Sequence, residues 1–569
     1  MMKNKGKFLH RRNLKTMALE VFLLLISAFL LAMSFPGGIF KNGLGFLVFI
    51  ALIPLFAVIR NTTFKAVWLY GFLYGFVFYW IFNYWLAAFH PLANILVQFI
   101  KGGEMILLFL ALKAADRFFN RKISFVVQAV MWVAYAYLSQ NWFAGYPYGT
   151  VAYALFRYRL LIQIADICGI WGLIVIIVVP QAFLGQYIAE KFSPSAKENV
   201  SFGKNIMENR IFVALYAAVV LFQLVYGAVT LAKWSKAPSD NTFDVATIQH
   251  NHDTWKGGYE TYEHNFHNLS RMSLEALQEN PDIIVWSETA FVPSVNWYTK
   301  YPYKGNDEGP AFDYLRKIQK LVDEFVEFGN NLGVPLLTGN PCGELDPQAD
   351  APYTKDGDWN KIDYNSVILF DNGKIQDAYL KQHLVPFTEH FPYEKQLPHL
   401  YKLLLANDYN WWEKGTESKV FKTSNGITFS TPICFEDIFG DLCAKFVDQG
   451  ADILINMTND SWSGSVAAER QHMAMAVFRS VENRRSMIRG TNSGITCLIT
   501  PDGKIQGEME PFVMKWKIWN VPVYSSETFG KTVYTRYRDV MAVICVYLSY
   551  ACLIGGAAYA VYKGVKKHE

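Results

Sequence analysis

Three residues that could carry chemistry each stand at the end of a short, apolar, strand-like run. Glu288 closes DIIVWSE, Lys381 follows DAYL, and Cys434 ends TFSTPIC. In layered α/β folds the ends of strands commonly gather into one site, so a carboxylate, a cation and a thiol could meet there. Each residue alone has an ordinary explanation, because buried cysteines pack as small hydrophobic groups, glutamates cap helices, and lysines are usually solvated. The three together indicate a catalytic site.

The segments that must position these residues alternate between strand and helix patterns. Strand-like runs cover residues 243–251, 281–290, 334–340, 364–381, 426–435, 451–460 and 494–509. Helical periodicity covers residues 264–279, 312–332, 439–449 and 467–484. The turns Asp371-Asn372-Gly373 and Pro501-Asp502-Gly503 contain residues that tolerate positive φ in tight hairpins. Strands that alternate with helices predict a layered α/β domain.

Apolar segments that could cross a bilayer flank this domain in the sequence. The chain is 52% hydrophobic, and a transmembrane helix needs about 20 apolar residues. The candidates are residues 17–33, 44–59, 66–89, 94–115, 123–139, 160–189, 211–231 and 540–562. We therefore expect a seven-span transmembrane domain at 1–231, a catalytic domain at 232–538, and a final transmembrane helix with its tail at 539–569. At roughly 300 residues, the inserted domain can bury its own core.

Basic residues predict the orientation of the spans. The flank MMKNKGKFLHRRNLK and the terminal YKGVKKHE are basic, and most other lysines and arginines between the spans fall in alternate loops. Because positively charged loops stay on the cytoplasmic side, we expect both termini in the cytoplasm and the inserted domain on the outer face. The first span has a basic start and small residues near AMS, as a signal peptide does. Since further spans follow directly, we expect an uncleaved anchor.

Composition gives no reason to expect a nucleic-acid partner, a metal or another cofactor. The formal net charge is only +4, which is too small to indicate binding to nucleic acid. The seven cysteines include no CxxC pair, so neither a zinc site nor a disulfide framework is indicated. A single bridge in an exported domain, Cys342 with Cys497 or Cys443, stays open as an alternative.

The motifs around the three residues resemble those of the nitrilase, or carbon–nitrogen hydrolase, superfamily. They are WSETAF, YLKQHLVPFTEHFP and PICFEDIFG, followed by INMTNDSWSG, FRSVENRR and PDGKI. With the apolar spans, the whole chain resembles the bacterial apolipoprotein N-acyltransferases. The resemblance implies a nitrilase-like α-β-β-α sandwich inserted into a multi-span helical domain of the bacterial cytoplasmic (inner) membrane, with the sandwich on the periplasmic face. Two departures, Tyr148 where the family usually has Trp and Phe435 where Tyr is common, concern local details of the acyl pocket.

The same resemblance implies a Glu-Lys-Cys triad and a ping-pong reaction. Cys434 would attack an ester of a membrane phospholipid and hold the acyl chain as a thioester. A free thiol has a pKa of about 8.5 and needs a base at neutral pH, a role that falls to Glu288. Lys381 and the backbone N–H of Phe435 would stabilise the oxyanion. The α-amine of the amino-terminal diacylglyceryl-cysteine of an apolipoprotein would then take the acyl chain.

Two further residues match positions that the family sets near its site. Glu389, in LVPFTE, would orient Lys381 or the nucleophile loop, with a solvated loop carboxylate as the alternative. Trp255 follows IQHNHDT and would lie near the reacting groups, with ordinary core packing as the alternative.

Other polar residues are expected to be structural. Glu436, Asn456, Asn459 and Asp460 follow strand-like runs, where polar groups more often satisfy turns than touch substrate. Arg479 and Glu482 are expected to be partners on one helix face.

Two aromatic and leucine-rich segments could rest on lipid. They are residues 296–314 and residues 397–415, the second of which carries the pair Trp411-Trp412. Such composition suits interfacial arms that gate access to the site, with helices packed on the core as the alternative.

Glu104 and Asp166 fall inside apolar spans, where a charge is costly. An ion pair with Lys101, or a place near the membrane edge, would explain Glu104 without a catalytic role.

Three functions compete on the sequence. The first is the lipid-dependent acyltransferase. The second is a membrane-tethered, nitrilase-like amidase that releases the thioester to water. The third is a non-catalytic membrane receptor with a nitrilase-like ligand domain, which loss of Cys434, Glu288 or Lys381 would have favoured; all three residues are present.

Overall fold

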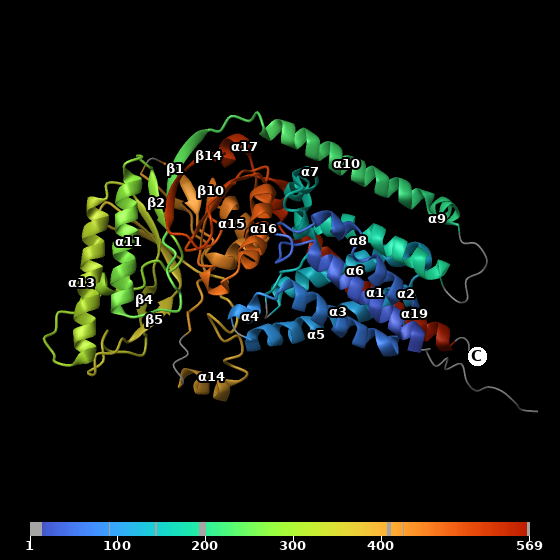
Figure 1. Ribbon diagram of the computed structural model, residues 1–569, viewed down its shortest axis with the longest axis horizontal. Coiled ribbons are helices and arrows are strands. Elements are labelled where there is room, and N and C mark those ends of the chain that lie inside the picture. Colours follow the sequence, from blue (N-terminus) through green and yellow to red (C-terminus); the bar gives the residue numbers. More distant parts are fainter. Residues whose placement is uncertain are drawn as a thin grey trace, which may run out of the picture.

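A computed structural model describes residues 14–89, 91–142, 145–192, 201–406, 411–424 and 426–565. Figure 1 shows two parts, a bundle of long helices and a layered sandwich of sheets and helices. Residues 1–13 and 566–569, which hold much of the basic charge used to predict orientation, lie outside the described residues.

Seven helices among the described residues are long and apolar enough to cross a membrane. They are α1 (Leu14–Met33), α3 (Phe64–Phe82), α5 (Pro91–Phe118), α6 (Arg121–Asn141), α8 (Ala165–Lys191), α10 (Arg210–Trp234) and α19 (Val540–Val565). Each coincides with a predicted span. Short helices connect them: α4 (Leu86–Phe89), η2 (Val151–Leu155), α7 (Arg159–Ile162) and α9 (Phe202–Glu208).

The predicted span at 44–59 is not one long helix. It consists of the 3-10 helix η1 (Gly45–Phe49) and the short helix α2 (Ile53–Asn61), with a break between them. Gln181 of α8 satisfies backbone groups at this break, because its side chain accepts from the Leu52 N–H at 2.7 Å and donates to the Val48 carbonyl at 2.9 Å. A break inside an apolar bundle is tolerated where neighbouring side chains replace the lost helix bonds.

Glu104 and Asp166, the two carboxylates singled out inside the spans, are both paired. Lys101 Nζ lies 2.5 Å from Glu104 Oε2, which also accepts from Ser139 Oγ at 2.8 Å. Asp166 accepts from Arg484 Nη2 at 2.8 Å. The predicted pairing of Glu104 with Lys101 is confirmed, and neither carboxylate needs a catalytic role to explain its place.

The sandwich is built from two six-stranded sheets. The first has the order β14-β1-β2-β3-β6-β7, and the second has the order β13-β12-β11-β10-β9-β8. The first sheet comprises β1 (Asn241–Gln249), β2 (Ile283–Trp286), β3 (Leu336–Gly339), β6 (Ser366–Asp371), β7 (Lys374–Leu380) and β14 (Lys515–Val523). The second comprises β8 (Phe421–Lys422), β9 (Thr428–Ser430), β10 (Ile453–Thr458), β11 (Ser486–Thr491), β12 (Cys497–Ile499) and β13 (Ile505–Glu508). A separate two-stranded sheet pairs β4 (Cys342–Leu345) with β5 (Lys361–Tyr364).

Helices cover both outer faces of the sandwich (Figure 1). Val245 and Val285 of the first sheet share a core with Ile455 of the second, whereas Ile248 and Trp286 face the opposite way. That outer face packs against α11 (Tyr259–Leu277) and α13 (Pro310–Asn331). The second sheet is covered by α15 (Gly440–Asp448) and α16 (Val466–Asn483), and α16 also contacts α8 of the bundle. The order of layers is α-β-β-α, as predicted.

In the first predicted lipid arm, the helical part packs on the core, which was the alternative. Its helix α12 (Val295–Lys300) buries Trp297 and Tyr298 against the α13 side of the sandwich. In the second arm, α14 (Pro398–Leu405) has no buried residue and exposes Leu400 and Leu403. Residues 407–410 of that arm lie outside the described part of the chain.

Candidate active site

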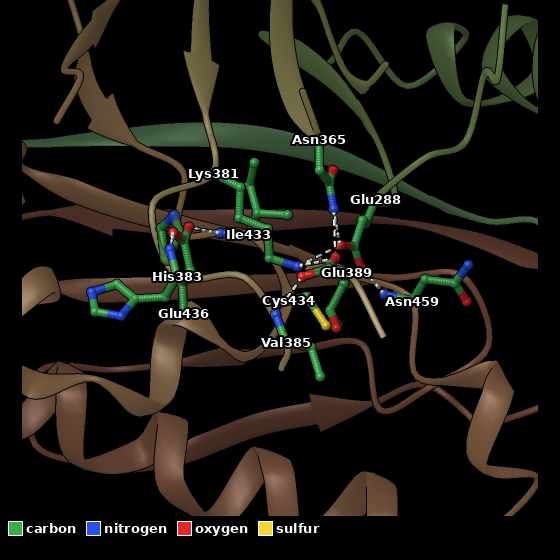
Figure 2. A network of polar contacts seen from close by, with 12 residues as sticks. Glu288, Asn365, Lys381, His383, Val385, Glu389, Ile433, Cys434, Glu436 and Asn459 are labelled. Atoms are coloured by element: carbon green, nitrogen blue, oxygen red, sulfur yellow. Dashed lines mark hydrogen bonds and ion pairs between the residues drawn. The ribbon is translucent and has the colours of Figure 1, made fainter. Parts of the chain in front are cut away.

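The three predicted catalytic residues leave three different strands and meet between the two sheets. Glu288 follows β2, Lys381 directly follows β7, and Cys434 begins the 3-10 helix η3 (Cys434–Ile438) after β9. Figure 2 shows their side chains converging, with Cys434 beside the cluster that Lys381 forms with its carboxylates.

Lys381 lies between two carboxylates. Its Nζ is 3.0 Å from Glu288 Oε1 and 2.8 Å from Glu389 Oε1, and its side chain is fully buried. Burial alone lowers the pKa of a lysine, but Glu288 and Glu389 raise the pKa of Lys381 well above 10.5. Lys381 is therefore a permanent cation, suited to stabilise negative charge and unsuited to act as a base. The solvated alternative for Glu389 is excluded by this contact.

Glu288 is held on both of its oxygens. Oε1 accepts from Lys381 and from Asn365 Nδ2, the latter at 2.9 Å, and Oε2 accepts from the backbone N–H of Asn459 at 3.0 Å. Asn365 also donates to Glu389 Oε1 at 2.9 Å, so one amide fixes both carboxylates. The carboxylate that would take a proton is thus fixed before any substrate binds.

Cys434 occupies a strained turn. Its φ is 51°, in the left-handed region that residues other than glycine rarely adopt. The Asn456 side chain holds this turn by donating to the carbonyls of Pro432 at 3.0 Å and Cys434 at 2.9 Å. Burial, followed by the Glu288 charge, raises the pKa of the Cys434 thiol well above 9.0. The thiol is therefore protonated at rest, and it needs a neighbouring base to become a nucleophile.

Glu436 joins the loop of Lys381 to the loop of Cys434. Its Oε1 accepts from the backbone N–H groups of Gln382 at 2.7 Å and His383 at 2.9 Å, and its Oε2 accepts from the Ile433 N–H at 2.8 Å. Burial raises the pKa of Glu436 to about 7. The expectation that Glu436 satisfies turns is borne out by these bonds, and the turns are those that carry the lysine and the thiol.

Phe435 and Trp255 lie at the edges of the cluster. Lys381 Nζ stands over the Phe435 ring at 5.7 Å from its centre. The Phe435 N–H is in the first turn of η3, where N–H groups have no partner within the helix. Trp255 is 67% exposed, so it is not a core residue, and the preceding Thr254 hydroxyl contacts Asn459 Oδ1 at 3.2 Å.

Sequence reasoning missed Asn365 and the partners of Asp460. Asn365 directly precedes β6, and the one available signal was an amide at a strand start. Asp460 contacts His472 and Arg489, and Arg489 also contacts Asp437. The expected pairing of Arg479 with Glu482 is present, with Nε and Oε2 2.9 Å apart.

None of the seven cysteines, all of which are described, forms a disulfide, so the bridge left open for Cys342 is absent. Within the described residues no group of three or more His, Cys, Asp or Glu side chains is placed to hold a metal ion.

Comparison with known proteins covers both parts of the fold. Residues 244–515 match the Carbon-nitrogen hydrolase family, and residues 27–183 match the Apolipoprotein N-acyltransferase N-terminal domain. Apolipoprotein N-acyltransferase 1 of Treponema denticola is 37% identical over 537 residues, which cover 93% of this chain and 94% of that protein. Apolipoprotein N-acyltransferase 1 of Treponema pallidum is 33% identical over 548 residues, with 95% and 96% covered. Apolipoprotein N-acyltransferase of Geobacter metallireducens is 29% identical over 545 residues, with 93% of each chain covered. The chain therefore belongs to the apolipoprotein N-acyltransferase family.

Proposed function

We propose that this chain moves an acyl chain from a membrane phospholipid, through a thioester on Cys434, to the α-amine of the amino-terminal diacylglyceryl-cysteine of apolipoproteins. The observation that carries the proposal is the buried cluster in which Lys381 contacts Glu288 and Glu389 beside the Cys434 turn. Family membership supports the acyl transfer, and the long apolar helices support a donor drawn from the bilayer.

In the first half-reaction the thiol is acylated. Glu288 takes the proton of Cys434 as the sulfur attacks the ester carbonyl of the phospholipid. The oxyanion that forms is stabilised by the Lys381 ammonium and by the Phe435 N–H. Collapse breaks the ester C–O bond, and the departing lysophospholipid oxygen takes the proton from Glu288. The acyl group remains on Cys434 as a thioester.

In the second half-reaction the acceptor amine attacks the thioester. Glu288 accepts a proton from the amine, the same donors stabilise the second oxyanion, and collapse breaks the C–S bond. The Cys434 thiolate then takes the proton back, and the product is an amide. Because the two substrates use one site in turn, the kinetics are ping-pong.

The proposed location is the cytoplasmic membrane of a bacterium, with both termini in the cytoplasm. The domain limits proposed are 1–231 and 539–569 for the membrane part and 232–538 for the sandwich on the periplasmic face. Exposed leucines on α14 support an approach of this face to lipid.

Intact-mass measurement of protein purified from membranes tests the nucleophile. Wild type should carry an acyl adduct on Cys434, whereas Cys434→Ala should carry none. Cys434→Ser should trap the acyl group as a stable ester, because an alkoxide leaves less readily than a thiolate. Glu288→Gln should stay unacylated, because an amide cannot take the thiol proton. Cys443→Ala, a substitution of a buried cysteine in α15, is the matched control and should load normally; an adduct on Cys434→Ala would refute the mechanism.

A further inference from the structure

A buried ion cluster adjoins the nucleophile turn. Asp437 stands in η3, three residues after Cys434. Its Oδ1 lies 2.8 Å from His472 Nε2, and its Oδ2 contacts Arg489 Nη1. His472 Nδ1 in turn lies 2.9 Å from Asp460 Oδ1, and Arg489 Nη2 lies 3.4 Å from Asp460 Oδ2. All four side chains are buried, and they form a closed ring of two carboxylates and two bases.

His472 carries two protons in this ring. Each of its ring nitrogens faces a carboxylate oxygen, and an ionised carboxylate can only accept, so both nitrogens must donate. Burial alone lowers the pKa of His472, but Asp437 and Asp460 raise it to about 9. Glu469 is a further acidic residue near the ring, and burial raises its pKa well above 4.5. The ring is therefore balanced, with two negative and two positive charges.

The two aspartates belong to the two segments that hold the reacting groups. Asp437 is in the 3-10 helix that begins with Cys434. Asp460 follows Asn459, whose backbone N–H donates to Glu288 Oε2 at 3.0 Å. His472 lies between the two aspartates and donates to both. A single imidazolium thus connects the turn of the nucleophile to the loop that holds the base.

The helix that carries His472 is anchored to the membrane bundle. Gln471, the preceding residue, accepts from Trp85 Nε1 at 3.0 Å and donates to the carbonyls of Pro36 at 2.8 Å and Phe82 at 3.1 Å. Pro36 lies in the segment after α1, Phe82 is the last residue of α3, and Trp85 follows α3. The position of His472 is therefore set by the membrane bundle as well as by the two segments that it joins.

We propose that His472 is a positioning residue whose doubly protonated ring sets the spacing between the Cys434 turn and the Glu288 carboxylate. The proposal rests on the proposed function, because it gives Cys434 and Glu288 their roles. Without the imidazolium, two buried carboxylates would share one guanidinium. Their repulsion would separate the η3 turn from the 459–460 loop.

The test compares His472→Gln with the double variant His472→Gln/Asp437→Asn. In the single variant a charge is lost and Asp437 faces an amide. In the double variant one negative charge is removed together with the positive one. The amides at positions 437 and 472 can then hydrogen-bond to each other, and the amide at position 472 can still donate to Asp460. His267→Gln is the matched control, because His267 is an exposed residue of α11. Cys434→Ala is the control for the proposed function.

Two rates are measured for the full-length protein in vesicles of phosphatidylethanolamine and phosphatidylglycerol, or in detergent. One is the rate of adduct formation on Cys434 at a series of phospholipid concentrations. The other is alkylation of Cys434 by iodoacetamide without phospholipid. We expect His472→Gln to lower both rate constants at least tenfold, with the half-saturating phospholipid concentration unchanged. The double variant should recover at least a third of the lost rate, and His267→Gln should match wild type.

The proposal would be overturned by wild-type rates in His472→Gln, or by a single variant that is slow with no recovery in the double variant. A change confined to the half-saturating phospholipid concentration would also contradict it. If wild type formed no adduct, or Cys434→Ala formed one, the proposed function would fail. The alkylation rates would still decide whether His472 positions the thiol and its base.

Discussion

At the scale of single residues, the proposed mechanism keeps the net charge of the site constant during the first proton transfer. Lys381 lies between Glu288 and Glu389, and the Cys434 thiol is protonated at rest. When the thiol proton moves to Glu288, the thiolate replaces the carboxylate as the negative group near Lys381. A buried site therefore gains no uncompensated charge in this step, which would otherwise be costly.

The charge state of His472 predicts how stability depends on pH. Its folded pKa of about 9 lies above its usual 6.5, so the stability it contributes is complete below pH 6.5 and is lost as pH rises through 9. Between pH 7 and pH 10 wild type should lose about 2–3 kcal/mol relative to His472→Gln. Thermal unfolding of both proteins in one detergent at several pH values measures this. The two melting temperatures should converge as pH rises, while parallel curves would contradict the assignment.

The proposed catalytic residues could be predicted from sequence, whereas their supporting partners could not. Glu288, Lys381 and Cys434 each sit in a local motif at a strand end, so neighbouring residues in the chain reveal them. Asn365 and His472 act through contacts with residues far away in the chain, such as Glu288 and Asp437. No local sequence pattern indicates such a pair, because the two residues come together only in the folded chain.

At the scale of elements, buried contacts between residues far apart in the chain explain why one strand and one span differ from the sequence-based predictions. The strand β11 was not predicted because Arg489 breaks its apolar pattern, yet Asp437 and Asp460 neutralise that arginine in the interior. Similarly, the segment 44–59 is apolar enough for a span, but Gln181 from another helix stabilises the break within it. The hairpin at Asn372-Gly373 was predictable, since both residues adopt the positive φ that the turn demands.

The helix α14 gives a prediction about lipid supply. Leu400 and Leu403 are 43% and 60% exposed, which suits contact with a bilayer surface. Changing both to Asn should raise the half-saturating phospholipid concentration for Cys434 loading several-fold. Discharge of preformed thioester to an acceptor peptide should stay unchanged, because that step needs no new donor. Leu274→Asn, at an exposed position of α11, is the control; an equal effect of both changes would argue against a lipid role for α14.

At the scale of the whole molecule, the connections place the sandwich on one side of the bundle. The chain enters β1 shortly after α10 and reaches α19 shortly after β14, and β1 pairs with β14 along its length. Both connections therefore run between neighbouring strands and the membrane helices. Such an insertion can leave and re-enter the bilayer only at one face. The positive charge of the loops predicts which face this is.

Labelling with a membrane-impermeant maleimide tests that orientation. Lys355 is an exposed residue of the sandwich, and Lys65 is an exposed residue in the first turn of α3. In cells with a permeabilised outer layer and an intact cytoplasmic membrane, Lys355→Cys should be labelled and Lys65→Cys should not. The native cysteines, which are buried or half-buried, set the background. The reverse labelling pattern would place the sandwich in the cytoplasm.

The fate of the thioester tests the central claim most directly. Protein acylated on Cys434 is freed of phospholipid and mixed with a peptide bearing an amino-terminal diacylglyceryl-cysteine, or with buffer alone. Loss of the adduct and gain of acyl mass on the peptide are followed by mass spectrometry. We predict rapid discharge with the acyl chain recovered as an amide on the peptide, and a slow loss in buffer. An adduct that is released to water as fast as to the peptide would contradict the acyltransferase and favour an amidase.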